Sequence, residues 1–267
     1  MHPIERLRMV ARAEGAGPSL LAGEAAGALA GFSSDPVALV TACRRLVDRH
    51  PEVGPVWWLC ARLLAGADPA VEAHRAAAEL DGDDTAAVLA AELPGQAAVT
   101  VVGWPEQAAQ ALRRRGDVEV FAVDFDGEGA ALARRLGSAG TDAWDVPPSG
   151  LAAATVNSSL VLLEAVSAGP DGILAAPGSR AAAAVARHAG VAVWVASGVG
   201  RCLPARLWQA QLERLDASPD EPWERRWEVV PLDLVDTWVG PGGPRPGADL
   251  PRSADCPVAA ELLRPAG

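Results

Sequence analysis

The chain has 267 residues, 50% of them apolar, and a formal net charge of −11 at pH 7. This length is enough for one large domain or two modest ones with a sizeable core. The acidic balance argues against non-specific binding to nucleic acid or to membrane surfaces, which needs a basic face, and the absence of a run of about 18 apolar residues argues against a transmembrane helix.

The first residues do not read as a targeting signal. The stretch from His2 to Arg8 is mixed in charge and lacks the apolar core of a signal peptide. We therefore expect a cytoplasmic protein.

Residues 1–94 are expected to form a helical N-terminal domain. Apolar residues recur near helical spacing from Pro36 to Arg49, and Asp35 stands where an N-cap is needed. Two further helices are predicted, from Pro55 to Leu64 and from Pro69 to Leu80. No strand-like alternation precedes Ala97, and Pro94-Gly95 marks the C-terminal boundary of this domain.

Residues 95–240 alternate between strands and helices. Apolar strands are predicted at Ala98 to Val102, Val118 to Val123, Thr141 to Val146, Ser159 to Glu164, a short run within Gly169 to Pro177, and Val191 to Val195. Helices are predicted at Glu106 to Arg115, Ala130 to Leu136, Ser149 to Thr155 and the alanine-rich stretch after Ser179. Such alternation, with strands apolar throughout, predicts an α/β domain whose parallel sheet is covered on both faces.

The last part of the chain is expected to contribute little. Trp227 to Val230 is predicted to be a late edge strand. Residues 241–267 form a Pro/Gly-rich tail and C-terminal segment, and Gly240 to Asp255 is expected to be loop or disorder.

Ligands of such a sheet bind at the carboxyl ends of its strands, in the loops after Val102, Val123, Glu164 and Val195. One candidate is Pro177-Gly178-Ser179. Gly178 permits close approach of a ligand, and the free N–H groups of a helix start attract anions. Two interpretations stay open, plain capping of the helix by Ser179 or ligand contact, and capping is favoured because serine caps are common.

Two other loops contain candidate ligand groups. Asp124 ends the second strand, where an acid can bind ribose hydroxyls, whereas Asp126 and Glu128 are interpreted as a solvated acidic turn. Arg201 follows Gly198 and Gly200. This loop either wraps an anion or is a flexible loop with a surface arginine.

Several chemistries find no support in the sequence. The chain has no lysine, which removes Schiff-base chemistry and the phosphate lysine of a P-loop. Its four histidines and four cysteines are scattered, so we expect free thiols and no metal site. No dinucleotide fingerprint or nucleophile elbow is present, and no pattern calls for a cofactor.

Several local patterns follow one another in a characteristic order. They are Gly15-Ala16 before a small-residue helix, Val123-Asp124 followed by Gly129, Asp145 at a strand end, the stretch from Leu160 to Ser179, and the stretch from Glu228 to Val235. Together they resemble the initiation factor 2B family from about Ala13 to Gly240. This family contains the alpha, beta and delta regulatory subunits of a translation factor and two sugar-phosphate isomerases, which act on methylthioribose-1-phosphate and ribose-1,5-bisphosphate.

The resemblance implies a helical N-terminal domain followed by a Rossmann-like domain that self-associates into a homo-oligomer. It also implies a site for a small phosphorylated metabolite. Gly15 and Ala16 thereby join the candidate ligand-binding residues Asp124, Gly178, Ser179 and Arg201. A role in translation initiation is implied only through protein partners, because so acidic a chain is poorly suited to hold RNA directly.

The departures from the family pattern weigh against catalysis. The isomerases' catalytic aspartate falls on Ala165, and their cysteine falls in Gly103-Trp104-Pro105. Their Asn-Lys pair falls on Ala175-Ala176. The phosphate-binding arginine falls on Asp126, and Glu14 replaces the arginine before the Gly-Ala turn.

Two functions therefore stay open. The first is a non-catalytic module of this family that senses a ligand or binds proteins. The alternative is a divergent isomerase-like enzyme for a sugar phosphate or nucleotide-related substrate, with Asp145 or Glu164 as candidate catalytic residues. Glu164 adjoins the lost aspartate but is expected on the other face of its strand.

Overall fold

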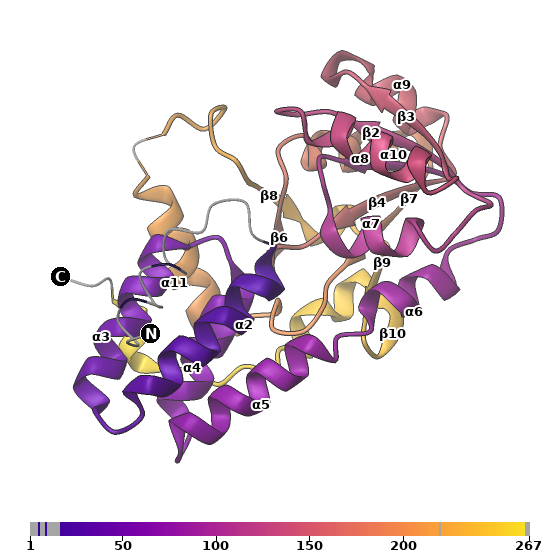
Figure 1. The fold of residues 1–267 in the computed structure, drawn as a ribbon. Coiled ribbons are helices and arrows are strands. Elements are labelled where there is room, and N and C mark those ends of the chain that lie inside the picture. Colours follow the sequence, from indigo (N-terminus) through magenta and orange to yellow (C-terminus); the bar gives the residue numbers. More distant parts are fainter. Residues whose placement is uncertain (1–4, 6–8, 10–16, 219, 265–267) are drawn as a thin grey trace.

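The computed structural model describes residues 5, 9, 17–218 and 220–264. Figure 1 shows a helical region built from the first part of the chain and, beside it, an α/β region built around a twisted sheet. Within the described residues, no helix is both long enough and apolar enough to cross a lipid bilayer.

The helical region consists of α2 (Pro18–Leu29), α3 (Pro36–Arg49), α4 (Gly54–Ala65) and α5 (Pro69–Asp81), and α6 (Thr85–Glu92) leads into the sheet. The prediction for α3 and its cap is confirmed, since an Asp35 oxygen accepts a hydrogen bond from the Ala38 N–H at 3.0 Å. Asp68 caps α5 in the same way, through the N–H groups of Ala70 and Val71. The predicted helices around α4 and α5 are also present, within one residue at each end.

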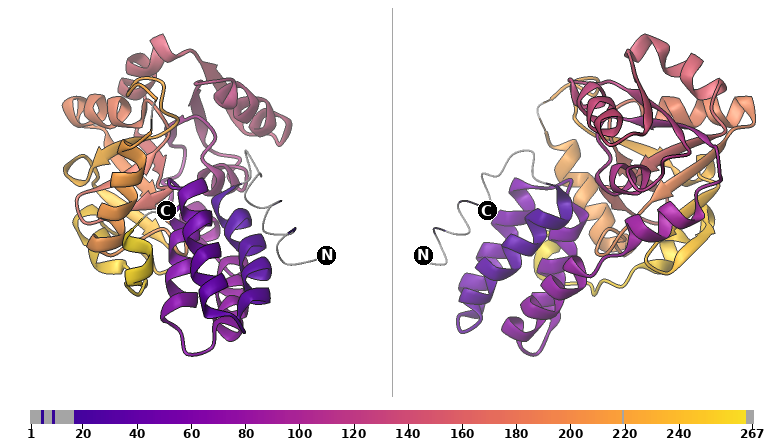
Figure 2. Two further views of the ribbon diagram at one scale, coloured as in Figure 1. Left: turned by 90° about the vertical axis from the view of Figure 1, so that its left-hand side faces the viewer. Right: turned by 45° about the vertical axis from the view of Figure 1, so that its right-hand side comes forward.

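The core of the helical region includes residues from the far end of the chain. Trp57 and Trp58 of α4 are buried together with Trp208 of α11 (Ala205–Asp216) and Leu262 of the short helix η5 (Ala260–Leu263). Arg44 donates to the Glu261 carbonyl at 2.7 Å, and Trp58 Nε1 donates to the Asp255 carbonyl at 2.8 Å. Figure 2 shows the C-terminal segment, in yellow, returning from the sheet to these helices.

The main sheet has seven strands in the order β10-β9-β7-β4-β1-β2-β3. All neighbouring pairs are parallel except the hairpin of β9 and β10. The strands are β1 (Ala98–Val102), β2 (Glu119–Val123), β3 (Asp142–Val146), β4 (Leu160–Glu164), β7 (Ala192–Ala196), β9 (Thr237–Gly240) and β10 (Gly243–Pro246). The predicted parallel sheet is therefore confirmed.

Helices cover both faces of this sheet, as predicted. Apolar residues of α6, α7 (Glu106–Leu112) and α8 (Glu128–Ser138) pack on one face. Those of α9 (Leu151–Val156) and α10 (Ser179–Ala189) pack on the other. The burial of β1 and β4 between these layers explains why their sequences are apolar throughout.

A second, antiparallel sheet of three strands departs from the prediction. The short apolar run at β6 (Gly172–Ala175) does not join the main sheet. It pairs with β5 (Ser167–Ala168) and with β8 (Glu228–Pro231), the strand that the sequence predicts as a late edge strand. The connection from β5 to β6 is too short for the crossover that a parallel neighbour requires, so the two strands form a hairpin.

The expectation of loop or disorder from Gly240 to Asp255 is wrong. β10 pairs with β9 and forms one edge of the main sheet, and a 3-10 helix, η4 (Gly247–Ser253), comes after it. Pro244 and Pro246 lack the N–H that a central strand needs, but an edge strand tolerates proline. The composition of this segment thus fits a sheet edge as well as it fits a loop.

Candidate functional site at the carboxyl ends of the strands

A pocket of about 580 Å³ lies between the helical region and the carboxyl ends of β1 and β4. The helical region contributes Gly17, Pro18, Glu52 and Val53. The α/β region contributes residues after β1 (Val102, Trp104, Pro105, Glu106), at the end of β4 (Leu163, Glu164, Val166), around β6 and α10 (Ala175, Ala176, Ser179), and further along the chain (Glu128, Asp220, Arg226, Trp227). This is the edge at which the sequence predicts a ligand.

Glu164 lines this pocket and is almost completely buried. Its Oε2 atom accepts hydrogen bonds from the backbone N–H groups of Gln107 (2.7 Å) and Ala108 (3.2 Å) at the start of α7. Its Oε1 atom accepts from Arg201 Nη1 at 2.8 Å. Both oxygens of this carboxylate are therefore occupied by donors of the chain.

Arg201 is fully buried, so the interpretation of its loop as flexible with a surface arginine is wrong. Besides Glu164, its Nη1 atom donates to the Ala165 carbonyl at 2.6 Å, while its Nε and Nη2 atoms have no partner among the described residues. The loop does wrap an anion, but one that belongs to the chain. The Val199 N–H donates to Asp83 Oδ2 at 3.0 Å, and a Cβ atom at Gly198 would collide with that carboxylate.

Asp124 also accepts hydrogen bonds from backbone N–H groups. Its Oδ1 atom accepts from the N–H groups of Gly129 (2.8 Å) and Ala130 (3.3 Å), which are free donors at the start of α8. A Cβ atom at Gly129 would lie within 2.8 Å of the Asp124 backbone, so this turn requires glycine. The structure thus gives Asp124 a local capping contact.

The start of α10 differs from the favoured interpretation. Gly178, at φ 92°, is the N-cap residue, and Ser179 begins the helix without a side-chain cap bond. The acceptor comes instead from Glu228 of β8, whose Oε1 accepts from the N–H of Arg180 at 2.8 Å. Ser179 is only 2% exposed and lines the pocket, and its hydroxyl makes no hydrogen bond to the described residues.

The remaining predicted residues do not join Glu164. Asp145 is exposed on β3, the opposite edge strand, and β2 and β1 lie between β3 and β4. Three strand spacings separate them by about 14 Å. Gly15 and Ala16 lie outside the described residues.

Sequence reasoning missed Glu106, the first residue of α7. It lines the pocket, its Oε2 atom is buried without a partner, and a Cβ atom at Gly17 would collide with it. Burial raises the pKa of the Glu106 carboxyl, the nearby carboxylates of Glu164 and Asp83 raise it further, and Arg201 partly offsets them. The sequence signal was weak, because a glutamate after proline at a helix start is ordinary.

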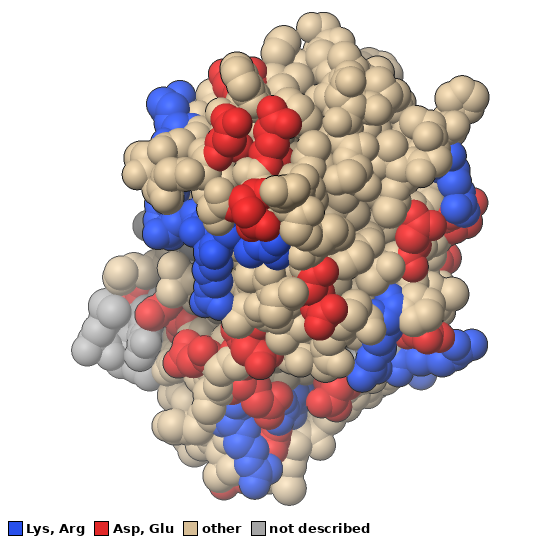
Figure 3. Space-filling model, turned by 90° about the vertical axis from the view of Figure 1, so that its right-hand side faces the viewer, with Lys and Arg blue, Asp and Glu red and all other residues tan. Residues whose placement is uncertain are grey.

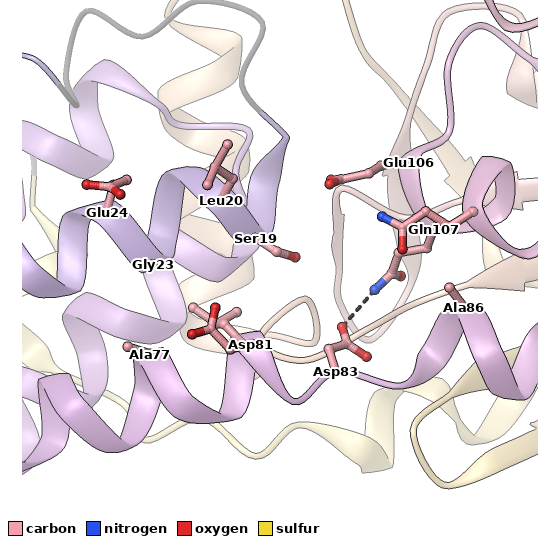
Figure 4. Close-up of a pocket in the computed structure, with 12 residues that line it drawn as sticks. Ser19, Leu20, Gly23, Glu24, Ala77, Asp81, Asp83, Ala86, Glu106 and Gln107 are labelled. Atoms are coloured by element: carbon pink, nitrogen blue, oxygen red, sulfur yellow. Dashed lines mark hydrogen bonds between the residues drawn. The ribbon is translucent and has the colours of Figure 1, made fainter. Parts of the chain in front are cut away.

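Glu106 also lines a second pocket, of about 410 Å³, between α2 and α5 on one side and α6 and α7 on the other. In Figure 4, Ser19 and Glu106 face each other from opposite sides, and Gln107 donates to Asp83 at 2.7 Å. Within the part of the chain that the structure describes, the charged residues that line this pocket are Glu24, Asp81, Asp83 and Glu106. All four are acidic.

The electrostatics of both pockets disfavour phosphate. Among the described residues, five carboxylates and one guanidinium group, that of Arg226, line the larger pocket. On the molecular face in Figure 3, acidic and basic side chains lie in small groups separated by uncharged surface. Among the described residues, no three His, Cys, Asp or Glu side chains gather as a metal site would require, and all four cysteines are free.

No family model matches this chain, and no curated protein is similar to it in sequence. Its fold does occur in solved structures. The translation initiation factor eIF-2B of Pyrococcus horikoshii OT3 is 16% identical, with a TM-score of 0.76 over 91% of this chain and 96% of that one. A chain of the tetrameric eIF2B-beta2-delta2 complex of C. thermophilum is 17% identical, with a TM-score of 0.73 over 94% and 92% of the two chains.

The translation initiation factor eIF-2B, subunit delta, of A. fulgidus is 15% identical, with a TM-score of 0.57 over 92% of this chain and 88% of that one. The structural neighbours are thus eIF2B-type proteins that match most of the chain at low identity. This confirms the predicted fold class and the fold that the sequence resemblance implies.

Replacing Glu106 with glutamine is expected to stabilise the protein at neutral pH by about 1 kcal/mol, because it removes the cost of a buried, unpartnered charge. The raised pKa means that the folded chain keeps a proton that the unfolded chain loses near pH 4.3. Stability from this group therefore falls as pH rises from about 4.3 through the raised value. Urea unfolding of E106Q and the parent protein at several pH values measures the difference.

The control for this experiment is E92Q, which removes an exposed carboxylate at the end of α6 that lines neither pocket. An equal rise in the free energy of unfolding in both variants would contradict a raised Glu106 pKa. So would a rise in E106Q that persists below about pH 4.

Replacing Arg201 with methionine is expected to destabilise the protein by about 3–5 kcal/mol, because Glu164 then stays buried without its counter-charge. The double variant E164Q/R201M is expected to recover part of this loss. Denaturant unfolding measures both. R113M, which removes an exposed arginine, is the control. If R201M loses no more stability than R113M, the Glu164–Arg201 ion pair does not stabilise the fold as proposed.

Proposed function

We propose that this protein is a non-catalytic module with the initiation factor 2B fold, which senses a small ligand or binds protein partners. One observation carries the proposal. The carboxylate that stands nearest to a catalytic position, Glu164, is committed to Arg201 and to two backbone N–H groups. Proton transfer in an isomerisation needs a positioned acid and base that are free to exchange protons.

The other candidates add no such pair. Asp145 is remote from the pocket, and Asp124 is occupied at the start of α8. Ala165 stands where the resemblance places the catalytic aspartate, and a methyl group can neither donate nor accept a proton.

Phosphate binding is disfavoured for a related reason. The first free N–H groups of α7, α8 and α10 are those that attract an anionic ligand to such a fold. Here they donate to carboxylates of the chain itself, those of Glu164, Asp124 and Glu228. A phosphate entering the pocket would find these N–H donors already occupied. It would also be repelled by the carboxylates that line the pocket.

One observation favours the alternative, a divergent isomerase-like enzyme for a sugar phosphate or nucleotide-related substrate. Glu106 combines a raised pKa with a place in a pocket of the size that small metabolites occupy, about 300–1,000 Å³. The carboxylates nearest to it, those of Glu164 and Asp83, already accept hydrogen bonds from the chain, and for that reason we rank this function second.

The proposal includes self-association and a cytoplasmic location. The eIF2B-beta2-delta2 neighbour is a tetrameric complex, and edge strand β3 exposes Trp144, which is 53% accessible. Any part in translation initiation would run through protein partners, because the acidic chain offers little to the phosphates of RNA.

Purified protein is expected to show no turnover of ribose-1,5-bisphosphate or methylthioribose-1-phosphate and no thermal shift with pentose phosphates or nucleoside monophosphates. A ligand at a hundredfold excess over its Kd stabilises the native state by about 2.7 kcal/mol, which a thermal-shift panel detects. Turnover that E106Q abolishes and E92Q leaves intact would favour the isomerase-like alternative instead.

Light scattering after gel filtration is expected to give a mass that is a whole multiple of 27.4 kDa, at least twice this value. W144A is expected to shift the distribution toward smaller species, because aromatic anchors carry much of the energy of interfaces. A parent protein that stays monomeric at high concentration contradicts self-association.

A further inference from the structure

The two pockets on either side of Glu106 share an unusual charge pattern. Apart from Glu106, the larger one is lined by the carboxylates of Glu52, Glu128, Glu164 and Asp220, and the smaller one by those of Glu24, Asp81 and Asp83. Arg226 is the one basic residue among the described residues that line them. Acidic groups alone do not make a site, so what matters is which of these groups lack partners.

Three polar side chains in the larger pocket are unused. Glu106 and Glu52 make no hydrogen bond or ion pair within the described part of the chain, and the Glu106 Oε2 atom is buried. Ser179 is almost completely removed from solvent, yet its hydroxyl also lacks a partner there. The buried Glu106 oxygen without a partner costs free energy unless a ligand satisfies it. The Ser179 hydroxyl, at the pocket wall, is free to take part in such a contact.

The described arginines near the larger pocket stack on its tryptophans or lie in solvent. Arg226 is 75% exposed and stands 3.9 Å from Glu128, a loose contact at the surface. Arg135 and Arg225 stack on the Trp104 and Trp227 rings, at 5.7 and 5.3 Å from the ring centres. None of them forms an ion pair with Glu52 or Glu106.

The rest of the larger pocket is apolar. Val53, Val102, Leu163 and Ala175 line it, together with the two tryptophans. A ligand that matches both properties carries positive charge on an aliphatic body. Carboxylates in both pockets, with Glu106 common to the two, favour an elongated molecule with more than one charge.

We propose that these pockets bind a linear aliphatic polyamine, with one ammonium group at Glu106 and its methylene chain along the apolar wall. The inference rests on the proposed function, because it names the ligand class of that same ligand-sensing site. An ammonium group donates three hydrogen bonds, which suits the free oxygens of Glu106, Glu52 and Ser179. A second ammonium group reaches the carboxylates of the smaller pocket beyond Glu106.

The test is isothermal titration calorimetry with spermidine at neutral pH and about 0.15 M salt, where charges on the open surface are largely screened. The parent protein is expected to bind one spermidine per chain. E106Q and E52Q are each expected to weaken binding about tenfold or more, the weight of a charge-assisted hydrogen bond. The matched control E92Q, which removes one exposed charge outside the pockets, is expected to change the Kd less than about twofold.

Two results overturn the inference. One is the absence of heat or stabilisation with spermidine. The other is equal weakening by E92Q and by the two pocket variants, which means diffuse attraction to an acidic surface. If E106Q fails to fold, E52Q still tests the inference, because the two carboxylates belong to different parts of the fold.

Failure of this inference stays separate from failure of the proposed function. Turnover of either sugar phosphate overturns the proposed function whatever spermidine does. A missing or unspecific spermidine signal without turnover overturns only the ligand class.

Discussion

The buried ion pair of Glu164 and Arg201 organises the centre of this molecule. Through it the end of β4, the start of α7 and the loop after β7 share one carboxylate and one guanidinium group. The Arg201 carbonyl also accepts a hydrogen bond from the N–H of Ala168 at 2.7 Å, which ties β5 to the same loop. A buried charge is costly unless an opposite charge compensates it, and Glu164 and Arg201 compensate each other. The position of α7, and with it Glu106 and the wall between the two pockets, depends on this pair.

A related constraint shapes the chemistry of the sheet edge. The fold brings several helix starts to the carboxyl ends of its strands, and their free N–H groups attract anions. In this chain, carboxylates of the protein itself accept these hydrogen bonds, Glu164 at α7, Asp124 at α8 and Glu228 at α10. The helix dipoles are therefore already matched, and the carboxylates left over in the pocket have no such compensation. The same architecture that suits an anionic ligand elsewhere becomes acidic here.

Local signals predicted most of the fold, and the parts that failed depend on distant partners. Asp35 before Pro36 identifies α3 because capping acts over three residues. The strands at β1, β2 and β4 are apolar because both faces are covered. By contrast, β6 has the same local pattern, and its place in the small sheet depends on β8, more than 50 residues away. The burial of Arg201 likewise depends on Glu164, 37 positions earlier, so glycine-rich surroundings suggested an exposed loop. No sequence pattern identifies Glu106, because the burial of its carboxylate oxygen without a hydrogen-bond partner arises only in the folded pocket.

The return of the C-terminal segment to the helical region has a consequence for biosynthesis. The contacts of Arg44 with Glu261 and of Trp58 with Asp255 span 217 and 197 residues. Such long loops close late, and a chain emerging from the ribosome meets its partners in order of synthesis. The helices made first therefore wait with an incomplete core, open at the site of Leu262, until almost the whole chain has been translated. A transcript cut short after β10 would yield a protein with an intact sheet and an unfinished helical region, a natural substrate for quality-control proteases.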